Sequence, residues 1–232
     1  MELNKFSVIS TNVEYDHNNN IIRKKYSMNV DIDITTIELK TLIDKYLLSI
    51  QDINIPISKI VNSYVEGDHI VYESEYCGRN IIELGFDISK FDNFKVYIAK
   101  MLEIVKLAKD NDLYFDPHPK NFVFNGDNDI FYVDFFPPYT DYLKDKRLNS
   151  AKNSEIQIID ENYQFFTKGF LAEHFCGDFL NIDLNAEKIF EQIYSMSKDI
   201  GLYSGSLNDF VCKAKHIRHI EDVRLKKNIF LL

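Results

Sequence analysis

The chain has 232 residues, 45% of them hydrophobic, and a formal net charge of −9 at pH 7. This length and composition allow a substantial core, in one bilobed domain or in two small ones. The negative charge disfavours nonspecific binding to nucleic acid or to an anionic membrane, and it leaves room for a cationic small-molecule partner.

Cysteine usage and the absence of long apolar runs predict a cytoplasmic protein. Cys77, Cys176 and Cys212 are too far apart for a Cys-x-x-Cys motif, and an odd number of cysteines does not indicate a disulfide framework. The first residues lack the basic start and apolar core of a signal peptide. No uninterrupted apolar run reaches the ~18 residues that a membrane-spanning helix requires. We therefore expect a reducing compartment and no membrane insertion.

In chain order, the first clear patterns are a strand and a helix. Residues 21–26 read as a strand, and because side chains alternate along a strand, Lys24 shares a face with the apolar residues two positions before and after it. Residues 36–50 are predicted to be helical. Thr35-Thr36-Ile37-Glu38 is a capping box, in which Glu38 bonds an amide at the helix start. Helical spacing predicts a buried stripe made of Ile37, Leu39, Leu42, Ile43, Tyr46 and Leu47.

Further helices are expected in the second half of the chain. Residues 92–110 have an apolar face made of Phe94, Ile98, Met101, Leu102, Val105 and Ala108. Residues 140–155 are polar and read as an exposed excursion. Helical patterns follow at residues 161–175, 185–199 and 206–224. No carboxylate spacing predicts metal ligation by the histidines of these last segments, His174, His216 and His219.

The segment from residue 116 to residue 134 has the strongest functional signal. Two short β-prone runs, 122–124 and 130–133, flank an Asn/Gly/Asp cluster that is typical of a hairpin turn. Because a hairpin brings its ends together, Asn121 and Asp134 should lie close enough to share a cation. Asp116 precedes them in a turn stiffened by Pro117 and Pro119.

These residue types suit phosphoryl transfer. That reaction needs a carboxylate to orient or deprotonate the acceptor hydroxyl, and oxygen ligands for the magnesium that neutralises the phosphates. Asp and Asn beside Pro and Gly are also ordinary turn residues. The order, the spacing and the flanking strands favour the site over that simpler interpretation.

The pattern Asp116-x-His118-Pro119-x-Asn121, followed by Val133-Asp134-Phe135, resembles the catalytic loop and metal-binding segment of the protein-kinase-like superfamily. The His-Pro pair is more similar to the aminoglycoside phosphotransferase and choline kinase branch. The resemblance implies that Asp116 is the catalytic base and that Asn121 and Asp134 are magnesium ligands. His118 would support the loop or pack as a structural histidine.

The resemblance also implies an α+β, bilobed protein-kinase-like fold. A small antiparallel-sheet N-lobe with one helix would occupy residues 1–74, and a hinge would occupy residues 75–80. A mainly helical C-lobe would occupy residues 81–232, with the catalytic loop at 114–121 and the metal segment at 130–138.

Residues 55–60, a Gly67-Asp68 turn and residues 69–79 are similar to the two strands and the hinge of that branch. Glu75 through Cys77 would then offer backbone groups to an adenine ring. Lys24 is the candidate phosphate-binding lysine; Lys25 or Arg23 takes this role if the strand register slips by one residue. Glu38 is the family-like partner of the lysine, in competition with its capping role.

The chain departs from the family pattern in three places. No glycine occurs between residues 6 and 20, so fewer backbone amides would cradle the phosphates. Tyr114-Phe115 stands before Asp116, where the family usually has His-Gly or His-Arg. After Asp134 come Phe135-Phe136-Pro137-Pro138 in place of Phe-Gly, which predicts a stiffer segment.

The expected function is transfer of the γ-phosphoryl group of ATP, or of another nucleoside triphosphate, with Mg2+, to a hydroxyl of a small molecule. Positioning and electrostatics would provide most of the rate enhancement. One alternative is a kinase-like pseudoenzyme or partner-binding module without turnover, which the missing glycines favour. Another is a protein kinase, which needs a wider acceptor groove. The identity of the acceptor and the oligomeric state stay open.

Overall fold

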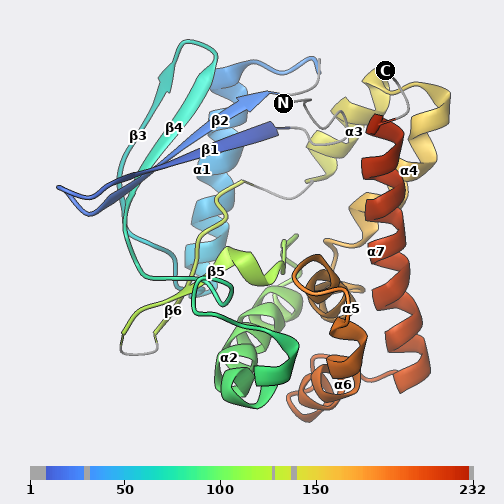
Figure 1. Ribbon diagram of the computed structural model, residues 1–232. Coiled ribbons are helices and arrows are strands. Elements are labelled where there is room, and N and C mark those ends of the chain that lie inside the picture. Colours follow the sequence, from blue (N-terminus) through green and yellow to red (C-terminus); the bar gives the residue numbers. More distant parts are fainter. Residues whose placement is uncertain (1–8, 29–31, 127–128, 137–139, 230–232) are drawn as a thin grey trace.

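The structure is a computed structural model that describes residues 9–28, 32–126, 129–136 and 140–229. It is an α+β protein in which a small antiparallel sheet with one helix lies beside a larger group of helices (Figure 1). None of the helices within these ranges has the length and apolar character needed to cross a membrane.

The sheet has four strands, β1 (Ile9–Asp16), β2 (Ile21–Met28), β3 (Ile60–Glu66) and β4 (His69–Glu75). Their order is β1-β2-β4-β3, and every neighbouring pair is antiparallel. The strand predicted at residues 21–26 is confirmed as part of β2, whereas residues 55–59 precede β3 and do not belong to it.

Helix α1 (Thr36–Asp52) connects β2 to β3 and packs against the sheet (Figure 1). Of the predicted stripe, Leu39, Ile43, Tyr46 and Leu47 are buried and Leu42 is half-buried, whereas Ile37 in the first turn is 71% exposed. The apolar faces of helix and sheet form one hydrophobic cluster, made of Tyr26, Ile32, Leu39, Ile43, Leu47, Ile70, Tyr72, Phe135 and Leu143.

A second, larger hydrophobic cluster takes most of its buried side chains from residues 91–108, 171–180, 186–193 and 202–214. Six α-helices follow β4 in the described part of the chain. They are α2 (Phe91–Asp110), α3 (Asp141–Ser150), α4 (Asn153–Gln164), α5 (Leu171–Gly177), α6 (Phe190–Asp199) and α7 (Leu207–Ile229). The apolar face predicted for residues 92–110 is confirmed, since every residue named for it is buried in α2.

Two predictions for the helical part are wrong. Residues 140–155 are not an exposed excursion but contain α3 and the start of α4, and Leu143 and Arg147 of α3 are buried. Residues 161–175 are not one helix, because α4 ends at Gln164 and α5 begins at Leu171. Between them, Phe165 and Phe166 leave the helical path and pack against Ile217 of α7.

A two-stranded ribbon, β5 (Phe122–Phe124) and β6 (Ile130–Tyr132), lies between the sheet and the helices (Figure 1). The predicted hairpin is confirmed, although residues 127–128 of its turn lie outside the described residues. Both edges of the ribbon are bonded. Arg79 and Phe124 exchange backbone hydrogen bonds of 3.1 and 2.9 Å, and the Tyr132 amide donates to the Pro56 carbonyl at 2.8 Å.

Gly78 allows the chain after β4 to reach the ribbon. Its φ of +133° is unfavourable for other residues, and a Cβ atom there would lie 2.0 Å from the Phe124 carbonyl oxygen. We expect Gly78→Ala to lower the free energy of unfolding by about 3 kcal/mol or more, measured by urea denaturation. Gly67→Ala is the matched control: its φ is +59° but no atom lies within 4 Å of the new Cβ, so about 1 kcal/mol should be lost. Equal losses would contradict this interpretation.

Candidate active site

The loop that contains Asp116 is fixed by its own hydrogen bonds. The Asp116 carboxylate accepts the His118 amide at 3.0 Å, and His118 Nδ1 accepts the Lys120 amide at 3.0 Å. A 3₁₀ turn over Pro119–Asn121 then leads directly into β5. Burial is the main cause that lowers the pKa of His118 to about 3. His118 is therefore neutral at pH 7 and acts as a structural acceptor in this loop.

Two side chains hold the backbone of Asp116 from the ribbon. Asn121 Nδ2 donates to the Asp116 carbonyl at 3.4 Å, and the Tyr132 hydroxyl donates to the same carbonyl at 3.1 Å. The Tyr132 contact was not anticipated from the sequence, because its partner is distant along the chain. With its nitrogen so used, Asn121 keeps Oδ1 as the oxygen that can bind a cation.

The ribbon places Asn121 and Asp134 within one residue of a common pairing position, as the hairpin pattern predicts. The Val133 amide donates to the Asn121 carbonyl at 2.8 Å, which extends the pairing of β5 and β6 by one step. Asp134 is the next residue, and its carboxylate accepts the Phe136 amide at 3.2 Å. An amide oxygen and a carboxylate in this position are suitable ligands for magnesium.

The charge of Asp134 is poorly compensated by the protein alone. Burial and the nearby charge of Asp116 raise the pKa of Asp134 to about 7, and only part of this effect is opposed by Lys24. A bound divalent cation would favour the ionised carboxylate. Asp134 is thus better suited to a cation complex than to the protein without one.

Lys24 is the basic residue of β2 whose side chain approaches Asp134. Its Nζ donates to the Val133 carbonyl and lies 4.9 Å from the centre of the Phe135 ring. Arg23 and Lys25 instead pair with Glu73 and Glu66, at 2.7 and 2.8 Å. The strand register therefore selects Lys24 from the three basic candidates.

A cavity of about 240 Å³ lies beside Lys24, between the sheet and the ribbon. Its lining includes Val13 and Ile22 of the sheet, Val123 and Val133 of the ribbon, and residues 75–78 at one end. Apolar surfaces on both sides and a polar backbone at the end are typical of a site for a flat ring.

At residues 75–77, some backbone groups are already in use. The Glu75 amide donates to the Lys59 carbonyl at 2.9 Å, and the Tyr76 amide donates to the Asn20 carbonyl at 3.0 Å. The Glu75 carboxylate pairs with Lys59 at 2.8 Å. Within the described part of the chain, Cys77 forms no backbone–backbone hydrogen bond, although its Sγ donates to the Glu75 carbonyl at 3.3 Å. Of the three residues predicted to offer backbone groups, Glu75 through Cys77, Cys77 fits better than Glu75 or Tyr76, whose amides are already bonded.

Glu38 lies at the start of α1 and not beside Lys24. Its carboxylate accepts the Thr35 amide at 2.7 Å and the Thr35 hydroxyl at 2.8 Å, while its own amide donates to that hydroxyl at 3.2 Å. These bonds lower the pKa of Glu38. Glu38 therefore caps the helix, which was one of the two predicted roles, and it does not pair with Lys24.

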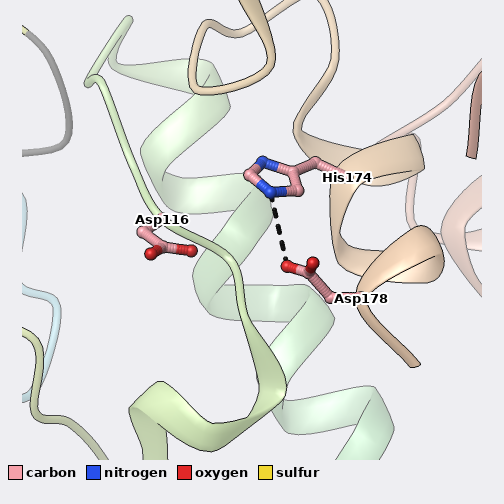
Figure 2. A group of neighbouring side chains, drawn as sticks. All are labelled: Asp116, His174 and Asp178. Atoms are coloured by element: carbon pink, nitrogen blue, oxygen red, sulfur yellow. Dashed lines mark ion pairs between the residues drawn. The ribbon is translucent and has the colours of Figure 1, made fainter. Parts of the chain in front are cut away.

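Sequence reasoning missed a group behind Asp116. His174 of α5 and Asp178 just after it approach Asp116 so that ligand atoms of all three lie within 4.8 Å of one another (Figure 2). His174 Nε2 lies 3.3 Å from the Asp178 carboxylate. No carboxylate spacing in the sequence predicted metal ligation by His174, but Asp178 lies four residues further on, which puts both side chains on one helical face.

The raised pKa of Asp134 predicts how stability depends on pH. Between its ordinary pKa of 3.8 and its folded pKa of about 7, the folded protein holds a proton that the unfolded chain releases. The free energy of unfolding should therefore fall as pH rises through this window. Asp134→Asn removes this titration. At pH 8 without divalent cations, the free energy of unfolding of the variant should exceed that of the parent by roughly 1–3 kcal/mol.

Urea denaturation at pH 5 and pH 8, with EDTA present, measures this difference. Asp145→Asn changes an exposed carboxylate of α3 and should follow the parent at both pH values. An Asp134→Asn protein that is less stable than the parent at pH 8 would contradict the assignment of an uncompensated charge.

Comparisons with known proteins add no family to this geometry. A scan against protein-family models and a search of curated proteins each found no match to this chain. The chemical arrangement around Asp116 and Asp134 is therefore the basis for assigning a function.

Proposed function

We propose that this protein is a phosphotransferase that moves the γ-phosphoryl group of Mg-ATP, or of another nucleoside triphosphate, to a hydroxyl of a small molecule. The main support is the convergence of Lys24, Asp116, Asn121 and Asp134 at one end of the ribbon, next to the cavity beside Lys24. A base, metal ligands and a phosphate-binding cation are the groups that this reaction needs.

We also propose that the fold is bilobed and kinase-like. Support comes from the helix α1 inserted between β2 and β3, and from the separate hydrophobic clusters under the sheet and among the helices. Residues 75–80 would form the hinge, because the chain passes there from the sheet to the edge of the ribbon.

In this proposal the nucleotide base occupies the cavity of about 240 Å³. Val13 and Ile22 would cover one face of the ring, and Val123 and Val133 the other. The backbone of Cys77 would bond the edge of the ring. The triphosphate would then extend toward Lys24, whose ammonium group lies beside the Val133 carbonyl.

Each side chain has a defined part in the reaction. Asp116 accepts the proton of the acceptor hydroxyl, and the hydrogen bonds of Asn121 and Tyr132 to its carbonyl keep it in place. Lys24 offsets phosphate charge in a site from which water is largely excluded. Asn121 Oδ1 and the Asp134 carboxylate would hold Mg2+, which supplies charge neutralisation at the phosphates.

One observation favours a second candidate, a nucleotide-binding module without turnover. The turn between β1 and β2 closes on itself, since the Asp16 carboxylate accepts the Asn18 and Asn19 amides at 3.0 and 3.2 Å. These amides are unavailable to phosphates, and a carboxylate stands where a glycine-rich loop would offer donors. Phosphate binding would then depend on Lys24 and the metal.

Asp116→Asn separates the two candidates. We expect millimolar Mg-ATP to raise the melting temperature of the parent and of the variant equally, because Asp116 does not bind the nucleotide. Release of ADP by the parent should be slow but measurable, and it should fall at least about 100-fold in the variant. Asp199→Asn, an exposed change in α6, is the control and should retain parental turnover.

The outcomes differ clearly. A parent that is stabilised by Mg-ATP but releases no ADP with any acceptor tested fits the second candidate. Unchanged thermal stability of the parent at millimolar Mg-ATP would contradict both.

A further inference from the structure

The side chain of His174 lies between a carbonyl and two carboxylates. Its ring is 2% exposed, and Nδ1 lies 3.0 Å from the Phe165 carbonyl oxygen. Nε2 lies 3.3 Å from the Asp178 carboxylate, and Asp178 itself is 1% exposed. Figure 2 shows the Asp116 carboxylate directed from the catalytic loop toward the same space.

These contacts determine the protons of the ring. A carbonyl oxygen can only accept, so Nδ1 must carry a hydrogen. If Nε2 were unprotonated, its lone pair would face the lone pairs of a buried carboxylate, which is unfavourable. A proton on Nε2 converts this contact into an ion pair, although Asp178 Oδ2 has no hydrogen-bond partner among the described residues. With Asp178 ionised, both ring nitrogens carry hydrogens and His174 is a cation.

The surroundings also need a positive charge at this position. Asp178 on the adjoining turn and Asp116 on the catalytic loop both face His174, with ligand atoms of all three within 4.8 Å of one another. Glu173 of the same helix instead approaches Lys213 at 3.5 Å. The other histidine that acts on this group is His118, which is neutral at pH 7 because burial lowers its pKa to about 3.

We propose that His174 is an imidazolium, paired with Asp178, that orients the Asp116 carboxylate. It is a positioning residue, since a ring nitrogen lies within 4.8 Å of the Asp116 carboxylate and His174 does not reach the reacting atoms. The aromatic rings of Phe165 and Phe166, with centroids 6.2 and 4.9 Å from the imidazole, shield this contact from water and so strengthen it. The catalytic consequence rests on the phosphotransferase function proposed above, whereas the charge of His174 does not.

The charge can be measured without any turnover. In the full-length protein labelled with 15N-histidine, NMR at pH 7 in the presence of EDTA should show both ring nitrogens of His174 protonated. Asp178→Asn should lower the pH at which this ring loses its second proton, because the anchoring charge is gone. A neutral ring in the parent would overturn the proposal. A ring signal that changes when EDTA removes a metal would also overturn it, in favour of a metal bound by Asp116, His174 and Asp178.

The positioning role can be tested by kinetics of Mg-ATP hydrolysis. His174→Gln and Asp178→Asn should lower kcat about 10-fold to 100-fold and leave KM for Mg-ATP unchanged, since neither residue lies at the nucleotide cavity. Glu173→Gln is the matched control, because it changes a buried carboxyl of the same helix that faces Lys213. It should keep the parental kcat even if its melting temperature falls.

Equal losses of kcat in Glu173→Gln and Asp178→Asn would overturn the positioning role and indicate general damage to α5. A parent without ATP turnover would contradict the phosphotransferase function only; the NMR result would still decide the charge of His174.

Discussion

The β5–β6 ribbon is the element on which the site depends. Each of its strands has three residues, and a pair this short is not stable alone in water. It persists because Arg79 bonds one edge and Pro56 the other, so the segments before β3 and after β4 are tied to it. The same pairing puts Asn121 beside Val133 and Asp134. The close approach of Gly78 to the Phe124 backbone is therefore also needed for the geometry of the site.

A second constraint is electrostatic. Asp134 and Asp178 each lie near Asp116 in poorly hydrated surroundings, where like charges are costly. Lys24 partly offsets Asp134, and in our proposal His174 offsets Asp116 and Asp178. The remaining negative charge at Asp134 reduces stability at neutral pH, and it is also what attracts a divalent cation. Such a conflict between stability and ligand binding is common at functional sites.

The sequence predicted what depends on local pattern. The hairpin, the buried face of α2 and the inward direction of Lys24 each follow from spacing within one segment. The break between α4 and α5 was missed because the packing of Phe165 and Phe166 against the distant Ile217 decided it, and Ile37 was misplaced because it lies in the first turn of α1. Glu38 fitted two sequence patterns, a helix cap and a partner for Lys24. The structure shows the cap, which needs only neighbouring residues. His174 and Asp178 have a readable spacing, but their approach to Asp116 depends on how α5 packs.

The central claim is that Asn121 and Asp134 hold a divalent cation beside Asp116. Anomalous diffraction near the manganese edge, from crystals grown with Mn2+ and a non-hydrolysable ATP analogue, tests it most directly. We predict an anomalous peak within about 2.5 Å of Asn121 Oδ1 and of an Asp134 carboxylate oxygen, with the phosphates on its far side. An occupied nucleotide cavity with no metal at these oxygens, or a metal bound instead between His174 and Asp178, would contradict the account.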